Sequence, residues 1–220
     1  MKNVTFKENP YIAVDNEQIQ LPKKLVYECI KRISDIVCSL IALIILSPVM
    51  LITMIAIYID DPGSVIFKQV RIGKDGKEFM IYKFRSMKIN AEELKEELID
   101  HNQSEGANFK MRHDPRRTRV GKFIRKASID ELPQLVNILK GDMSIIGPRP
   151  FIPEEQSLLP GDRLLVKPGL SCYWQIGGKN TLSIQEQIAL DRKYVAERSF
   201  LVDLKIIIKT FFVIFNKDNK

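Results

Sequence analysis

The feature that most constrains this chain is an uncharged, strongly apolar run over residues 36–59. As a straight helix the run reaches about 36 Å, which is enough to cross the hydrocarbon core of a bilayer. It starts too late and is too long for the apolar region of a cleaved signal peptide, and no small-residue cleavage site follows it. The run therefore predicts a membrane helix.

Ser47 and Pro48 lie near the middle of this run. Proline removes one backbone hydrogen bond and clashes with the preceding turn, so we expect a kink. Both flanks are basic, with Lys23, Lys24, Lys31 and Arg32 before the run and Lys68, Arg71, Lys74 and Lys77 after it. The positive-inside rule puts such flanks in the cytoplasm. The pattern favours a re-entrant helix broken at Ser47-Pro48; a kinked single span is the alternative.

The chain as a whole has the composition of a globular protein. Hydrophobic residues make up 45% of it, which excludes a disordered tail, a collagen and a polytopic carrier. The net charge of +7 indicates an anionic partner: a nucleic acid, a phosphorylated small molecule or an anionic lipid. The three cysteines show no metal-ligand spacing, which favours a reduced chain facing the cytosol.

The local patterns predict an α+β fold. Residues 64–70 and 79–84 are β-branched and aromatic with Asp75-Gly76 between them, which predicts a short β-hairpin. Helices are expected over 91–100, 120–126, from Ile129 to Gly141, and 183–198, and residues 201–215 fit an interfacial amphipathic helix. We divide the chain into a polar arm (1–30), the membrane helix (31–60) and a small, mostly helical cytosolic domain (61–220) with its C-terminal interfacial helix at about 200–216.

A basic cluster and a carboxylate pair are the first candidates for a site. The cluster consists of Lys110, Arg112, Arg116, Arg117, Arg119, Lys122, Arg125 and Lys126. It suits phosphate, but equally a solvated face or anionic lipid. Directly after it, Ser128 and Glu131 match a capping box with Asp130 between them. Alternatively, Asp130 stays ionised beside the arginines, and the two carboxylates attack phosphorus or hold Mg²⁺.

Two further motifs carry cations. Prolines on both sides of Arg149 fix the backbone and orient one arginine, although a rigid turn with a surface arginine has the same sequence. Along the strand expected at 79–84, Lys83 and Arg85 point to one face and offer a paired cation site. The alternative is an edge strand protected by charge.

Taken together, these motifs resemble the monotopic phosphoglycosyl transferases, the bacterial sugar transferases that initiate capsule, exopolysaccharide and glycan synthesis. The resemblance runs from Lys31 to about Leu204. It rests on KRISD and LSP in the apolar helix, YKFRSM, DPRRTRVGKFIRKASIDELPQL, NILKGDMSIIGPRP, KPGL and WQIGGKN. The combination is specific, whereas no single piece is.

The resemblance implies an enzyme with a re-entrant helix, interfacial helices and a compact catalytic part. It would transfer a phosphosugar from a UDP-sugar to polyprenol phosphate, usually undecaprenyl phosphate, and release UMP. Asp130 would be the nucleophile that forms a covalent phosphosugar intermediate, and Glu131 would assist through Mg²⁺, for which Mn²⁺ could substitute. The family's basic positions correspond to Lys83, Arg125 and Arg149, and we add Arg85 from strand geometry. The implied location is the cytosolic face of the bacterial inner membrane.

Two other functions remain open at this point. One is a non-catalytic, membrane-bound partner of a polysaccharide synthesis machine, against which the intact Asp130-Glu131 pair argues. The other is a membrane-associated nucleic-acid binder that uses the basic cluster. Only Phe109 and Phe123 are aromatic there, which is sparse for base stacking, so no nucleic-acid partner is expected. A homo-oligomer is compatible with the sequence.

Overall fold

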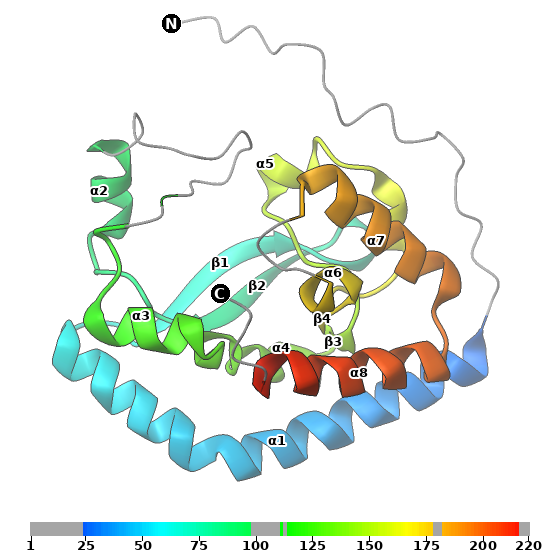
Figure 1. Ribbon diagram of the computed structural model, residues 1–220, viewed down its shortest axis with the longest axis horizontal. Helices are drawn as coiled ribbons and strands as arrows, with labels where there is room; N and C mark the ends of the chain where they lie inside the picture. The colour runs from blue at the N-terminus through cyan, green and yellow to red at the C-terminus, as the bar shows by residue number, and fades with distance from the viewer. Residues whose placement is uncertain (1–23, 98–110, 112–113, 178–181, 216–220) are drawn as a thin grey trace, which may run out of the picture. The chain divides into compact units, whose positions relative to one another are not determined.

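The computed structural model describes residues 24–97, 111, 114–177 and 182–215. Figure 1 shows the described elements as a ribbon. In chain order they are α1 (Leu25–Asp60), β1 (Ile66–Ile72), η1 (Lys74–Gly76), β2 (Glu78–Phe84), α2 (Ala91–Glu97), α3 (Arg119–Lys126), η3 (Ile129–Glu131), α4 (Gln134–Lys140), β3 (Ser144–Ile146), α5 (Pro153–Gln156), η4 (Gly161–Leu165), β4 (Gly169–Ser171), α6 (Tyr173–Ile176), α7 (Ile184–Glu197) and α8 (Phe200–Phe215). The chain is therefore α+β and mostly helical, as predicted.

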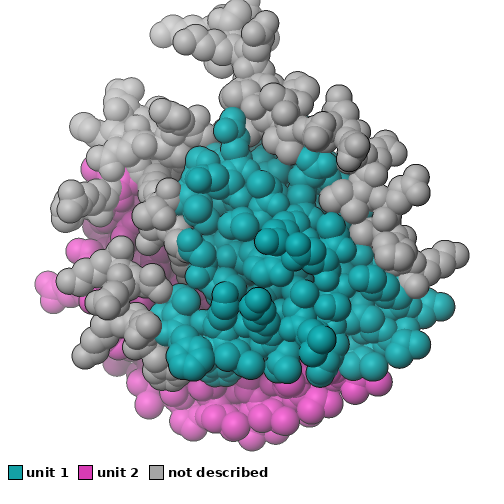
Figure 2. Space-filling view, turned by 45° about the vertical axis from the view of Figure 1, so that its right-hand side comes forward, with its two compact units in different colours: residues 1–32, 71–79, 142–220 teal, residues 33–70, 80–141 magenta. Residues whose placement is uncertain are grey.

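The chain forms two compact units, which Figure 2 shows in different colours. Unit 1 comprises residues 1–32, 71–79 and 142–220, and unit 2 comprises residues 33–70 and 80–141. The hairpin of β1 and β2 contributes residues to both units, because the division falls within each strand.

Unit 2 is organised around a small apolar cluster. Ile57 of α1, Phe84 of β2 and Ile124 of α3 are each almost completely buried. Val120, Ile129 and Leu132 pack against them. Glycine is required at residue 121, because a Cβ there would lie 1.9 Å from the carbonyl oxygen of Ser86. This close approach holds α3 against the segment that follows β2.

Helix α1 is, within the described residues, long and apolar enough to cross a bilayer. Large apolar side chains such as Ile44, Ile45 and Ile52 are exposed along it. The helix begins at Leu25 rather than at residue 31, and it continues through Pro48. Figure 1 shows it bending near its middle. Membrane association follows from its length and surface.

The hydroxyl of Ser47 compensates for the backbone hydrogen bond that is lost at Pro48. Pro48 has no N–H to donate to the carbonyl of Ile44, one turn earlier. The hydroxyl of Ser47 donates to that same carbonyl oxygen at 2.8 Å. The backbone can thus bend at Pro48 without leaving the Ile44 carbonyl unsatisfied, which matters in a lipid environment. Re-entrance of the helix remains a prediction.

Unit 1 contains a second core, built from distant parts of the chain. Strands β3 and β4 pair in parallel, with Ser144 opposite Gly169 and Ile146 opposite Ser171. Trp174, Tyr194 and Ile206 close the core from α6, α7 and α8. A Cβ on Gly169 would lie 2.0 Å from the backbone nitrogen of Gly147. The GPRP and KPGL motifs are therefore packed backbone to backbone.

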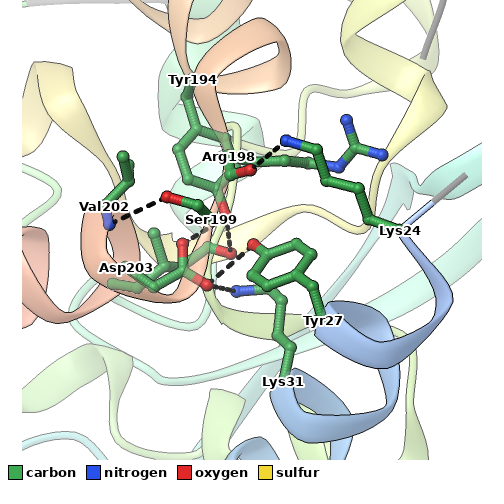
Figure 3. A network of polar contacts seen from close by, with 9 residues as sticks. Lys24, Tyr27, Lys31, Tyr194, Arg198, Ser199, Val202 and Asp203 are labelled. Atoms are coloured by element: carbon green, nitrogen blue, oxygen red, sulfur yellow. Dashed lines mark hydrogen bonds and ion pairs between the residues drawn. The ribbon is translucent and has the colours of Figure 1, made fainter. Parts of the chain in front are cut away.

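A buried polar network ties the start of α1 to α8 within unit 1 (Figure 3). The carboxylate of Asp203 accepts hydrogen bonds from Tyr27 at 2.9 Å, Lys31 at 2.7 Å and Tyr194 at 2.8 Å. The ammonium of Lys24 donates to the carbonyl of Arg198 at 2.8 Å. These contacts explain how a charged residue is accommodated in the otherwise apolar segment 201–215.

Most expected elements are confirmed, with one correction. The hairpin, the helices α3 and α7 and the helical nature of residues 201–215 are as predicted, and α2 covers the described part of 91–100. The single helix expected from Ile129 to Gly141 is instead a short 3₁₀ turn, η3, followed by α4. Pro133, the N-cap residue just before α4, accounts for the break. His101 and His113 lie outside the described residues.

Candidate active site

The carboxylate pair lies on η3, a short turn anchored at both ends. Ile129 and Leu132 pack into the apolar cluster of unit 2, and Asp130 and Glu131 between them are half-buried. Ser128, which precedes the turn, has the left-handed φ of 55° and makes no side-chain cap. The predicted capping box is therefore wrong at this position. The segment instead forms a turn that carries the two carboxylates and has no cap from the Ser128 side chain.

Strand β2 brings a cation to this turn. The Lys83 ammonium forms an ion pair with the Oε1 of Glu131 at 2.9 Å. The position of β2 next to α4 is fixed by Asn137 of α4, which is fully buried. Its Nδ2 donates to the carbonyl of Met80 at 2.7 Å, and its Oδ1 accepts the backbone N–H of Tyr82 at 3.0 Å. Asn137 thus holds α4 against β2 next to Lys83.

Arg125 faces the same pair from the end of α3. Burial and the nearby Arg117 lower the pKa of the Arg125 guanidinium, and the attraction of Asp130 opposes that shift. The pKa of arginine is high enough that Arg125 stays charged at neutral pH. Arg125 therefore places a positive charge near Asp130.

The rest of the basic cluster is divided among different roles. Arg116 is buried and forms a two-point ion pair with Asp114, with distances of 2.9 and 2.7 Å. Burial alone would raise the pKa of Asp114, but hydrogen bonds from Arg116 hold it below the usual value. Arg119, Lys122 and Lys126 are exposed on α3 around the exposed Phe123. Lys110 and Arg112 lie outside the described residues.

Arg85 does not share a partner with Lys83. Its guanidinium is buried and donates to both the carboxylate and the backbone carbonyl of Asp61, just after α1. Asp61 also accepts the backbone N–H of Ile89 at 2.9 Å. In the structure Arg85 thus ties the end of α1 to the segment after β2. A contact with substrate remains a prediction for this residue.

Arg149 lies in unit 1, between two buried prolines. Its guanidinium carbon lies 5.3 Å from the ring centre of Trp174 and 6.0 Å from that of Phe151. Among the residues that the structure describes, no carboxylate forms an ion pair with it. A half-buried guanidinium held by aromatic faces has hydrogen-bond donors to offer an oxyanion.

Asp130 and Glu131 are the two carboxylate candidates for a Mg²⁺ site. No group of three or more histidine, cysteine, aspartate or glutamate side chains gathers closely enough for a metal in the described part of the chain. Mg²⁺ is commonly held by one or two carboxylates, with water and substrate phosphates completing its shell. The adjacent, half-buried Asp130 and Glu131 fit that requirement.

Sequence reasoning did not single out several residues that support the candidate side chains within each unit. Asp61 directly follows the helix expected over 31–60, Asn137 lay in a segment assigned to helix alone, and Arg163 and Asp191 were not considered. Asn137 gave a usable signal, because a polar residue within the apolar run LVNIL is expected to satisfy a buried backbone group. The ion pairs Asp61–Arg85 and Arg163–Asp191 gave no such signal, since each joins residues far apart in the sequence.

The chain belongs to the bacterial sugar transferase family, whose model matches residues 26–217. It is 44% identical over 188 residues to the galactosyl transferase CpsE of Streptococcus agalactiae, covering 84% of this chain and 42% of that protein. It is 41% identical over 196 residues to the undecaprenyl-phosphate galactose phosphotransferase of Salmonella typhimurium, covering 86% and 41%.

A third relative is matched along most of its length. The exopolysaccharide production protein ExoY of Sinorhizobium fredii is 40% identical over 187 residues, which is 82% of this chain and 83% of that protein. In contrast, this chain spans less than half the length of CpsE and of the Salmonella phosphotransferase. The family is thus established, and the resemblance drawn from the motifs is confirmed.

Proposed function

We propose that this chain transfers a phosphosugar from a UDP-sugar to undecaprenyl phosphate at the cytosolic face of the membrane and releases UMP. This would be the first membrane step of a polysaccharide or glycan assembly. The relatives' names support a sugar-phosphate transfer onto a lipid phosphate. The observation that carries the proposal is the anchored turn η3, which holds Asp130 and Glu131 beside Lys83 and Arg125.

In the first step an Asp130 carboxylate oxygen attacks the phosphorus that bears the sugar. The bond between that phosphorus and the bridging oxygen of the diphosphate breaks, and its electron pair leaves with UMP. The product is a phosphosugar ester of Asp130. An oxygen of the lipid phosphate then attacks the same phosphorus and expels the aspartate carboxylate, giving a lipid diphosphosugar. Two successive displacements predict ping-pong kinetics.

The cations of unit 2 make this attack electrostatically possible. An anionic carboxylate and an anionic diphosphate repel each other unless fixed positive charge lies nearby. Lys83 and Arg125 supply such charge. Asp130 and Glu131 would hold Mg²⁺, or Mn²⁺ in its place, and the bound ion would offset the negative charge of the donor diphosphate. Arg149 would bind the donor through its two-pronged guanidinium.

The membrane helix gives a reason for the lipid acceptor. A lipid phosphate stays at headgroup depth, so an enzyme that uses it must work at the bilayer surface. The exposed apolar side chains of α1 and α8, among them Ile52 and Phe212, suit burial in the membrane and its interface. A re-entrant α1 would keep both ends of the helix on the cytosolic side.

The decisive experiment measures UMP release before any lipid acceptor is added. A panel of UDP-sugars is incubated with the purified protein in detergent and Mg²⁺. We expect one UMP per enzyme and a matching mass increase on the peptide that contains Asp130. The Asp130→Asn variant should release none, whereas the control Asp75→Asn, in the exposed hairpin turn, should behave like wild type. UMP release that requires acceptor, or a fully active Asp130→Asn variant, would refute the covalent route.

A further inference from the structure

The backbone around Arg149 is hydrogen-bonded at nearly every position within unit 1. The Gly147 N–H donates to the carbonyl of Ser171 at 3.0 Å, and the Pro148 carbonyl accepts from Gly169 at 2.9 Å. The Pro150 carbonyl accepts from the Arg71 guanidinium at 3.3 Å. The Phe151 carbonyl accepts the backbone N–H of Ile72 at 2.9 Å. Such a segment is rigid, and the remaining question is what fixes Arg149 itself.

A buried ion pair, Arg163–Asp191, holds the backbone of Arg149. Arg163 of η4 and Asp191 of α7 are each only 2% exposed and bind each other directly. Nη2 of Arg163 also donates to the Arg149 carbonyl at 2.7 Å. The backbone N–H of Arg149 in turn stabilises the charged form of Asp191. The pair thus holds the Arg149 carbonyl by a hydrogen bond and keeps the Asp191 charge close to the Arg149 backbone.

Further contacts lock Arg163 in this place. Its Nη1 donates to the Oε1 of Gln156 at 3.1 Å, and its guanidinium carbon lies 4.3 Å from the ring centre of Phe151. The Phe151 ring therefore touches both guanidinium groups, that of Arg163 and, at 6.0 Å, that of Arg149. A shift of Arg163 would disturb the Arg149 backbone and the ring against which its side chain rests.

We infer that Arg163 and Asp191 are positioning residues that aim the Arg149 guanidinium at the donor diphosphate without touching the donor themselves. This inference rests on the donor-binding role proposed for Arg149. A buried ion pair is costly to desolvate and is often replaceable by apolar residues without loss of stability. Its presence at this place is accounted for by the Arg149 carbonyl, which Arg163 holds by a hydrogen bond.

The chain offers a matched control between the same two elements. Asp162 and Arg192 form a second ion pair between η4 and α7, at 2.6 Å. Asp162 directly precedes Arg163 in the sequence, and Arg192 directly follows Asp191. Arg192 binds Asp162, whereas the Arg149 carbonyl is bound by Arg163. Removing the Asp162–Arg192 pair changes the connection between η4 and α7 without changing the support of Arg149.

The test replaces each pair by apolar residues and measures thermal stability together with KM and kcat for the UDP-sugar. The double variant Arg163→Met with Asp191→Leu should stay folded, because no unpaired buried charge remains. We expect its donor KM to rise about tenfold with little change in kcat, as for lost ground-state binding. The control Asp162→Leu with Arg192→Met should keep the wild-type KM.

Each outcome decides the matter. A double variant that is stable and has an unchanged donor KM overturns the inference, because the pair is then only structural. If the double variant does not fold, Arg163→Lys decides, since lysine keeps the charge but cannot serve Asp191 and the Arg149 carbonyl in the same geometry. A raised KM then supports the inference and a normal one overturns it. An inactive wild type overturns the proposed function and this inference with it.

Discussion

Two ion pairs, one in each unit, place charge in opposite ways. In unit 2 the Lys83–Glu131 pair is partly open to solvent, with side-chain exposures of 24% and 27%. In unit 1 the Arg163–Asp191 pair is closed off, with exposures of 1% and 3%. An exposed pair exchanges partners at little cost, whereas a buried one is expensive to open. We therefore expect the Lys83–Glu131 pair to open readily, while Arg163 and Asp191 keep a fixed geometry.

The largest expected effect comes from replacing one partner of an ion pair and leaving the other in place. Asp191→Asn leaves the buried Arg163 without a charged partner and should lower the free energy of unfolding by about 3–5 kcal/mol. Lys83→Met opens a half-exposed pair and should cost at most about 1 kcal/mol. Chemical unfolding of both variants in the same detergent measures the difference. Similar losses for the two would contradict the contrast between the units.

Next in size is the effect of exchanging arginine for lysine at the two arginines proposed to bind the donor. Arg125→Lys and Arg149→Lys keep the charge but lose the planar fork. Loss of one charged hydrogen bond, about 1.5–3 kcal/mol, would reduce kcat/KM for the donor about ten- to a hundredfold. Arg119→Lys, on the exposed side of α3, is the control and should be silent. Near-normal rates for Arg125→Lys or Arg149→Lys would remove that residue from the donor site.

A smaller effect should appear at Glu155, a second buried charge in unit 1. Neither carboxylate oxygen accepts a hydrogen bond from the described residues. Burial raises the pKa of Glu155, although the nearby Arg71 and Arg149 oppose the shift. Because the folded protein holds this proton more tightly than the unfolded chain, the contribution of Glu155 to stability is full below its unfolded pKa. That contribution is lost as the pH rises through the folded pKa.

Glu155→Gln should therefore remove the part of the stability that wild type loses as the pH rises through the folded pKa of Glu155. Melting temperatures across a pH series, for this variant and wild type, measure the change. Glu154→Gln is the matched control, since Glu154 precedes it on α5 and is exposed. If Glu154→Gln and Glu155→Gln give the same pH profile, the burial of the Glu155 carboxylate has no energetic consequence.

The sequence predicted local structure well and long-range contacts poorly. The periodic apolar residues of α7 and the Asp75-Gly76 turn carry their own signals, so these elements were placed correctly. The parallel pairing of Ser144–Ile146 with Gly169–Ser171 depends on close backbone approach at Gly147 and Gly169, which no local pattern reports. For the same reason the motifs named Asp130, Glu131 and Arg149 but not the groups that hold them.

The capping motif shows the same limit on a smaller scale. Two segments read Ser-x-x-Glu, at Ser128–Glu131 in unit 2 and at Ser183–Glu186 in unit 1. Only the second forms a capping box, in which Ser183 accepts the backbone N–H of Glu186 and Glu186 accepts that of Ser183. At the first, Pro133 delays the α-helix until Gln134, and Ser128 turns into the left-handed region instead.

The smallest predicted effect separates these two serines. Ser183→Ala removes a cap and should cost about 1 kcal/mol of stability, whereas Ser128→Ala removes none and should be close to neutral. Hydrogen bonds from Ser183 lower the pKa of Glu186. The contribution of the Glu186 carboxylate to stability is therefore present above its unfolded pKa and is lost as the pH falls through its folded pKa. Ser128→Gly should stabilise slightly, because glycine adopts a φ of 55° without strain. Equal losses for Ser128→Ala and Ser183→Ala in chemical unfolding at neutral pH would restore the cap at Ser128 and, with it, a purely structural reading of the turn that carries Asp130.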